Sequence, residues 1–166
     1  MSYKRKTWKE KLEDKKKFPK ILKFDPKFPC GRALVKMGAK PGDPVVLAPP
    51  IEVDEIMRQV PQGKLITLNE ICMKIAKLHN VKYCCTLTTG IFIMTAANAA
   101  EEGKEKGEKN TTPYWRTLKI GGFLNDKFPG RAISQKRLLE KEGFRILQKG
   151  KKFVVENYEN FLVKGN

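Results

Sequence analysis

The side chains best suited to chemistry in this sequence are four cysteines and a single histidine. They are Cys30, Cys72, Cys84, Cys85 and His79. No two cysteines have the C-x-x-C spacing of a zinc or thiol–disulfide motif, so we expect no metal, no other cofactor and no disulfide framework. Nucleophilic chemistry at Cys84-Cys85 would need a nearby base, and His79 and Lys82 are the candidates. A buried pair without a chemical role explains the same two residues.

A second group of candidate residues is the aromatic pair Tyr114-Trp115, followed by Arg116. A phenol has a pKa near 10 and is a weak nucleophile at neutral pH without an adjacent histidine. The pair is better suited to stacking on a nucleobase. Its alternative role is that of core aromatics beneath a turn, and Arg116 could equally serve to hold that turn by hydrogen bonds.

The charge of the chain favours an anionic partner. Its 166 residues include 34 Lys or Arg against 18 Asp or Glu, which gives a formal charge of +16. Residues 1–24 carry ten basic and three acidic side chains and residues 131–166 carry nine and four, whereas residues 51–80 are neutral. Nucleic acid is therefore the first candidate partner, gripped through its backbone phosphates.

The apolar pattern is that of a globular protein and not of a membrane protein. Hydrophobic residues make up 40% of the chain, enough for a core. No apolar run reaches about 18 residues, and no apolar signal core follows the basic N-terminus. We expect a monomer with no membrane contact, located in the cytoplasm and associated with the nucleoid if the source is prokaryotic.

The elements that must position these side chains follow from periodicity, caps and turns. Residues 1–24 form a basic arm with a helix over 7–17, and residues 25–50 form a Pro/Gly-rich packed linker with one strand at 43–48. The domain at 51–145 contains helices over 53–60, 68–79, 90–102 and 131–141, with a β-hairpin of residues 115–124 turning at Gly121-Gly122. Residues 146–166 form a C-terminal β extension, a hairpin turning at Lys149-Gly150.

This order of elements predicts an α+β fold that is mainly helical. It is a winged helix-turn-helix domain with a small β-hairpin wing and a C-terminal hairpin. A capping box, Thr67-Leu68-Asn69-Glu70, opens the helix over 68–79.

Two sequence blocks resemble the DNA-binding domain of alkylguanine-DNA alkyltransferases. They are VPQGKLITLNEI (60–71) and PYWRTLKIGGFLNDKFPGRAISQKRLLEKEG (113–143), with residues 91–100 in the place of the recognition helix. Those enzymes flip an alkylated guanine and accept its alkyl group on the Cys of a P-C-H-R motif. Tyr114 stands at that Cys and Trp115 at the His, so the chain is more similar to the alkyltransferase-like proteins, which bind alkylated DNA without repairing it.

The resemblance implies a non-enzymatic protein that binds double-stranded DNA, alkylated or unmodified, and flags lesions for a repair-protein partner. It implies a base pocket around Tyr114, Trp115, Arg116 and Glu142. It places the family's Arg finger at Thr95 and its phosphate-rotating Tyr at Leu68. The expected DNA contacts are Thr67, Thr95, Asn98, Lys119, Lys127, Arg131, Lys136 and Arg137.

Two other functions are compatible with the same sequence. An RNA- or protein-binding adaptor would use the neutral, Ala-rich helix over 90–102 as a docking face. A residual alkyltransferase would use a relocated nucleophile at Cys84 or Cys85.

Overall fold

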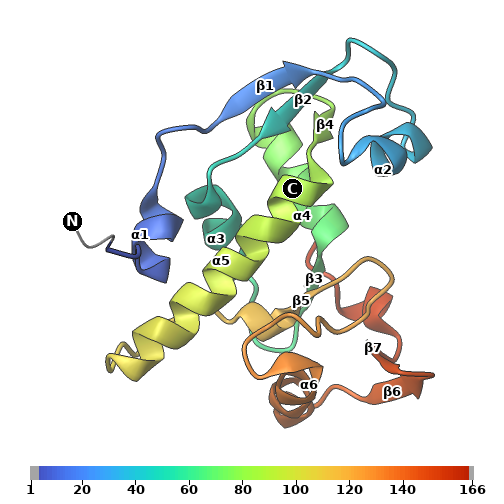
Figure 1. Ribbon diagram of the computed structural model, residues 1–166. Helices are drawn as coiled ribbons and strands as arrows, with labels where there is room; N and C mark the ends of the chain where they lie inside the picture. Colours follow the sequence, from blue (N-terminus) through green and yellow to red (C-terminus); the bar gives the residue numbers. More distant parts are fainter. Residues whose placement is uncertain (1–3, 165–166) are drawn as a thin grey trace.

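The computed structural model describes residues 4–164 and has three parts (Figure 1). A three-stranded sheet with a short helix lies at one end, three helices form the middle, and a unit with one helix and short strands lies at the other end. The longest of these three helices, α5 (Thr86–Glu105), runs diagonally across the view. The fold is α+β and mainly helical, as predicted.

The middle layer contains α3 (Pro50–Arg58), α4 (Leu68–Leu78) and α5. Pro50 occupies the first turn of α3, where its missing N–H costs nothing. The capping box between Thr67 and Glu70 is confirmed at the start of α4. These helices bury one continuous apolar cluster, in which small side chains of α5 let α3 and α4 approach closely; it includes Val53, Met57, Ile71, Ile75, Ile93, Ala96, Ala97 and Ala100.

The sheet at the first end is built from β1 (Lys20–Lys23), β2 (Pro44–Leu47) and β4 (Tyr83–Cys84). β1 and β2 are antiparallel, and β2 pairs with β4 in parallel. The helix α2 (Gly31–Lys36) lies between β1 and β2 in the sequence, and a Cβ at Gly31 would lie 2.1 Å from the Pro26 carbonyl oxygen. The strand predicted at 43–48 is confirmed, whereas β1, β4 and α2 were not predicted.

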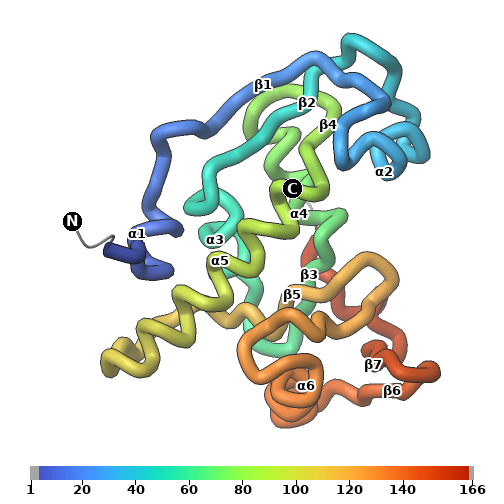
Figure 2. Tube along the Cα trace, viewed as in Figure 1, coloured from blue at the N-terminus to red at the C-terminus, as the bar shows by residue number. Residues whose placement is uncertain are grey.

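The basic arm contributes α1 (Trp8–Glu13), which is shorter than the predicted helix over 7–17. Figure 2 follows the chain from α1 along the outside of the molecule to β1. Leu12 is buried, and the Glu102 carboxylate of α5 accepts from the backbone N–H of Trp8 at 3.1 Å. This part of the arm is therefore packed on α5; residues 1–3 of the predicted arm lie outside the described residues.

The other end contains β3 (Ile66–Thr67), β5 (Thr117–Leu118) and α6 (Arg131–Lys141). The predicted hairpin over 115–124 forms only in part. Gly121 and Gly122 do turn with positive φ, and the Lys119 N–H donates to the Phe123 carbonyl. However, Tyr114–Arg116 is a 3-10 helix and β5 pairs in parallel with β3, so β5 has no antiparallel partner strand after the turn.

The predicted C-terminal hairpin is confirmed as β6 (Ile146–Lys149) and β7 (Lys152–Val155). Phe123 bridges to Val154 of β7, which supports the Gly-Gly turn from outside. A 3-10 helix (Tyr158–Phe161) follows, and the predicted extension ends at 165–166, outside the described residues. None of the helices in residues 4–164 is long and apolar enough to cross a membrane.

Candidate nucleic-acid interface

A groove of about 580 Å³ lies between α2, the first half of α5 and the segment 117–128, which we call the wing segment. This volume is within the usual range of about 300–1,000 Å³ for small-molecule sites. The residues that line it are Pro29, Cys30, Arg32, Ala33, Leu68, Thr86, Leu87, Gly90, Ile91, Ile93, Met94, Thr117, Leu118, Lys119, Ile120, Asn125, Lys127 and Phe128.

The charged side chains that line the groove are all cationic. Arg32 comes from α2, and Lys119 and Lys127 come from the wing segment on the other wall. No Asp or Glu lines the groove, whereas a cavity of about 370 Å³ between α1, α3 and α5 is lined by both signs. Like charges across an apolar cleft focus a positive potential, so this groove attracts an anion.

The floor of the groove is an apolar stripe on α5. Leu87, Ile91 and Met94 have the i, i+4, i+7 spacing of one helix face. The Leu87 side chain is 46% exposed and that of Ile91 is 55% exposed. Leu68, the first residue of α4, also lines the groove and adds to this apolar surface.

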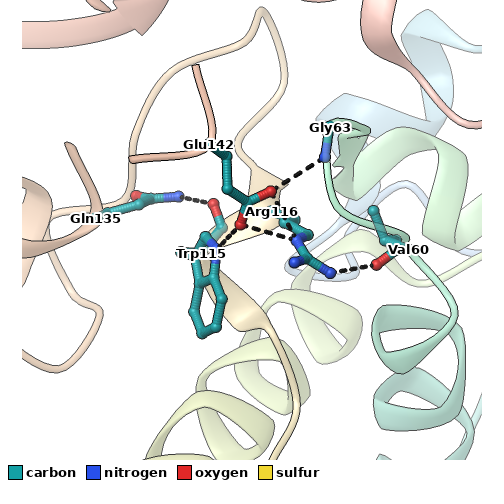
Figure 3. A network of polar contacts seen from close by, with 6 residues as sticks. All are labelled: Val60, Gly63, Trp115, Arg116, Gln135 and Glu142. Atoms are coloured by element: carbon teal, nitrogen blue, oxygen red, sulfur yellow. Dashed lines mark hydrogen bonds and ion pairs between the residues drawn. The ribbon is translucent and has the colours of Figure 1, made fainter. Parts of the chain in front are cut away.

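Glu142 fastens the segment that carries Trp115 and Arg116 (Figure 3). Its carboxylate accepts from the Trp115 indole N–H, from Arg116 Nε at 3.0 Å and from the backbone N–H of Gly63 at 3.1 Å. Arg116 also donates from Nη1 to the Val60 carbonyl at 2.8 Å. The structure thus brings three of the four predicted pocket residues into contact. Their side chains form hydrogen bonds with one another and with the backbone of Val60 and Gly63.

Gln135 connects α6 to the wall of the groove. Its buried amide nitrogen donates to the carbonyls of Trp115 and Thr117, at 3.0 and 3.1 Å. Its oxygen accepts from the backbone N–H of Asn125 at 2.7 Å. Because the Gln135 side chain binds the backbone of the wing segment at both Thr117 and Asn125, it fixes the backbone that carries Lys119.

Tyr114, the fourth predicted pocket residue, belongs to the core. It is 2% exposed, packs edge-on against Trp115 and Phe128, and donates its hydroxyl to Glu101 at 2.6 Å. Burial, followed by the hydrogen bond to Glu101, raises the pKa of the phenol well above its usual range. In this structure Tyr114 therefore offers neither a face for stacking nor a phenolate for attack.

The predicted DNA contacts divide by exposure. Lys119 and Lys127 line the groove. Thr67 and Thr95 are buried, because the Thr67 hydroxyl bonds to Glu70 in the capping box and that of Thr95 donates to the Ile91 carbonyl. These two hydroxyls have no access to DNA in this structure.

The other predicted contacts lie on α5 and α6. The Asn98 amide donates to the Met94 carbonyl. On α6, Arg131 pairs with Asp126 at 2.8 Å and Lys136 with Glu140 at 3.0 Å, while Arg137 is exposed. None of these four side chains lines the groove.

The four cysteines are all free and buried. Burial raises the pKa of Cys30 to about 12. The hydrogen bond between Cys72 and Cys84 raises the pKa of the first thiol and lowers that of the second. His79, one of the two candidate bases, pairs instead with Glu52 at 2.7 Å. Within residues 4–164, no three potential ligands are grouped to hold a metal ion.

The fold of this chain is similar to that of solved structures of DNA complexes. No protein-family model matches the chain, and no curated protein matches it in sequence. S. pombe ATL in complex with DNA has a TM-score of 0.50 and 20% identity to this chain, over 70% of this chain and 94% of that one. This is a shared fold of the helix-turn-helix type. S. pombe Atl1 in complex with damaged DNA containing O6-carboxymethylguanine gives a TM-score of 0.45 and 22% identity over the same shares.

Several residues of the interface were not predicted from the sequence. Arg32 and the stripe Leu87, Ile91 and Met94 line the groove, and Gln135 holds its wall. The i, i+4, i+7 spacing from Leu87 to Met94 was a readable signal for the stripe. No local signal exists for Arg32, because α2 is held in place by the cluster that joins Leu34 to Phe24 and Tyr83, which are distant in the sequence.

Proposed function

We propose that this protein binds duplex DNA through the groove between α2, α5 and the wing segment, without catalysing a reaction on it. The observation that carries the proposal is the lining of the groove, which holds three cations and no carboxylate. Support comes from the helix-turn-helix type of fold, which the chain shares with S. pombe ATL in complex with DNA. Cations opposite a polyanion release its counterions on binding, which makes the affinity strongly salt-dependent.

We propose further that the groove accepts an alkylated base displaced from the duplex. Its apolar floor would contact the flat face of a base, while Arg32, Lys119 and Lys127 hold the flanking phosphates. Unstacking a base costs a few kcal/mol and costs less where the base is damaged, so a groove of this kind favours lesions.

The proposal includes no alkyl-transfer step, because the side chains that could act as nucleophiles are buried. Tyr114 is buried and hydrogen-bonded in its protonated form. Cys84 has a lowered pKa, but it is buried at the end of β4 beside Thr89 and does not line the groove. Cys30 does line the groove, but it is buried, and burial raises the pKa of its thiol to about 12. Incubation with alkylated duplex followed by intact-mass measurement tests this part, because a mass gain of one alkyl group would overturn it.

The main test is a titration of two duplexes that differ only in one O6-alkylguanine. Anisotropy at moderate salt should give a tighter Kd for the alkylated duplex than for its unmodified twin. Equal affinities would refute lesion binding and leave DNA binding standing. An RNA duplex that competes as well as DNA would instead favour the adaptor function.

Charge-reversal variants test whether DNA binds in the groove. Lys127→Glu changes a lysine of the groove, and Lys151→Glu makes the same change in the exposed turn between β6 and β7, outside the groove lining. Lys127→Glu should weaken DNA binding at least about tenfold, since it replaces a phosphate contact with repulsion. Similar losses for both variants would show that only the overall charge matters and would refute this site.

A further inference from the structure

The strand β1 forms an open edge of the first sheet. The strand order is β1-β2-β4, so β1 has a neighbour on one side only. All four of its side chains are exposed, including those of Ile21 at 55% and Leu22 at 39%. In Figure 1 this strand runs along the outside of the molecule, at the end remote from α6. β1 therefore contributes backbone pairing to the sheet but no side chain to a core.

Two aromatic side chains fix β1 at its ends. Phe18 packs edge-on against Phe92 of α5, with 5.3 Å between the ring centroids. Phe24 is 2% exposed, and its backbone N–H donates to the Asp43 carbonyl at 2.7 Å. Because the strand is held at both ends, a segment that pairs with it meets an edge that is already formed, which lowers the entropic cost of binding.

The hydrogen bond of Phe24 also shows which backbone groups of β1 face the open side. In an antiparallel pair, alternate residues direct their N–H and C=O toward the neighbouring strand and away from it. Because Phe24 faces β2, Leu22 does so as well, and Ile21 and Lys23 direct their backbone groups outward. Pro44 lies opposite Lys23 and has no N–H to donate, which agrees with this alternation. Outward donors and acceptors on an edge are a template for another strand.

The charge around β1 is positive. Between Asp14 and Asp25 the chain has five lysines and no acidic residue. All five are exposed, and none lies in an ion pair with a carboxylate of residues 4–164; they are Lys15, Lys16, Lys17, Lys20 and Lys23. Successive side chains of a strand point to opposite faces, so each face of β1 presents one lysine beside one apolar side chain. Acidic residues opposite the lysines and apolar residues between them would form stabilising cross-strand pairs.

We propose that β1 binds an extended acidic segment of a partner protein, which adds a fourth strand to the sheet. Across β1 this segment reads acidic, apolar, apolar, acidic. A second copy of the chain fits poorly, because two β1 strands paired in register bring Lys20 opposite Lys23. DNA phosphates would use the lysines but leave the outward backbone groups and Ile21 without a partner. None of residues 15–24 lines the groove, so the inference does not rest on the proposed DNA binding.

The test uses a short fluorescein-labelled peptide with Glu-Val-Ile-Glu at its centre, titrated with the full chain and followed by anisotropy. This peptide should bind, and no binding would refute the proposal. The double variant Lys20→Glu with Lys23→Glu should weaken binding at least about tenfold, since attraction becomes repulsion. The matched control is Lys149→Glu with Lys151→Glu, which reverses two exposed lysines of the β6–β7 hairpin and should leave peptide binding unchanged. Equal losses would mean that only the overall charge attracts the peptide, and would overturn the site at β1.

Methylation of the peptide backbone separates strand pairing from charge attraction. N-methyl groups on alternate amides block the hydrogen bonds when those amides face β1 and leave them intact when the amides face away. Of two peptides methylated in the two alternate phases, one should lose binding and the other should keep most of it. Equal affinities for the two would overturn strand addition.

Two further measurements decide between the occupants of the edge. The protein without peptide should elute as a monomer; a dimer that Ile21→Pro converts to a monomer would assign the edge to a second copy, because proline at this position blocks the open side and removes no bond to β2. Lys20→Glu with Lys23→Glu should lower duplex affinity no more than the control does, and a loss as large as that of Lys127→Glu would assign the edge to DNA. Either result would overturn the proposal. Peptide binding is measured without DNA, so its failure leaves the proposed function standing, and the failure of DNA binding leaves this proposal standing.

Discussion

Replacement of Glu142 by alanine should separate a structural role of this carboxylate from a role in a base pocket. Its side chain is 8% exposed and that of Arg116 is 15% exposed. Glu142→Ala leaves the Arg116 guanidinium with only its bond to the Val60 carbonyl and leaves the Trp115 indole N–H without an acceptor. Breaking a buried ion pair by removing one partner costs about 3–5 kcal/mol.

The expected loss is therefore about 3–5 kcal/mol in the free energy of unfolding, measured by urea denaturation. In a chain of this size each kcal/mol corresponds to roughly 2–4 °C in Tm, so the melting temperature should fall by about 10 °C. Glu142→Gln, which keeps one acceptor, should lie between alanine and the native residue.

Glu140, in the last turn of α6, provides the matched control two residues away. It pairs with Lys136 at the surface, so Glu140→Ala should change stability by less than about 1 kcal/mol. The reasoning would be refuted if Glu142→Ala lost less than about 1 kcal/mol, or if it stayed folded at its usual temperature while losing discrimination between alkylated and unmodified duplexes. The second result would restore Glu142 to a base pocket.

Three further predictions concern the core, the docked arm and the Gly-Gly turn. Tyr114→Phe should cost about 1 kcal/mol in urea denaturation and leave DNA affinity unchanged, because it removes only the bond to Glu101. The hydrogen bond from the backbone N–H of Trp8 lowers the pKa of Glu102. The ionised carboxylate therefore stabilises the docking of α1 at a pH above its unfolded pKa, and this stabilisation is lost as the pH falls through its folded pKa. Glu102→Gln should accordingly show a weaker dependence of Tm on acid pH. Gly122→Ala should lower the free energy of unfolding by at least about 2 kcal/mol, because the φ of Gly122 is +84° and the new Cβ would meet the Tyr158 ring. Gly150→Ala is the control: its φ is also positive, but the new Cβ would meet nothing within 4 Å, so the same urea denaturation should show about half that loss.

The parts of the fold that the sequence predicts are those governed by neighbours along the chain. The capping box at Thr67 and the C-terminal hairpin depend on residues within a few positions, and both form as predicted. α2 was missed because it has six residues and is stabilised from far away, by a cluster that joins Leu34 to Phe24 and Tyr83.

The difference between local and distant contacts also explains which site residues were predicted correctly. Lys119 and Lys127 were predicted as DNA contacts and do lie in the groove, although contact with DNA stays a prediction. Tyr114 was placed in a pocket because the resemblance of its sequence block to the alkyltransferase-like proteins implies one there. Its burial is decided by Phe128 and Glu101, which reach it only through the tertiary fold.

The two kinds of surface in the groove respond differently to salt, which gives a last prediction. Three phosphates held by Arg32, Lys119 and Lys127 would contribute a slope of about −2.7 to log K against log salt, so affinity should fall roughly 40-fold between about 50 and 200 mM. Contacts of the apolar stripe release no counterions. The ratio of affinities for alkylated and unmodified duplexes should therefore stay constant over this range while both affinities fall. A ratio that collapses with salt would show that the cations, and not Leu87 and Ile91, distinguish the lesion.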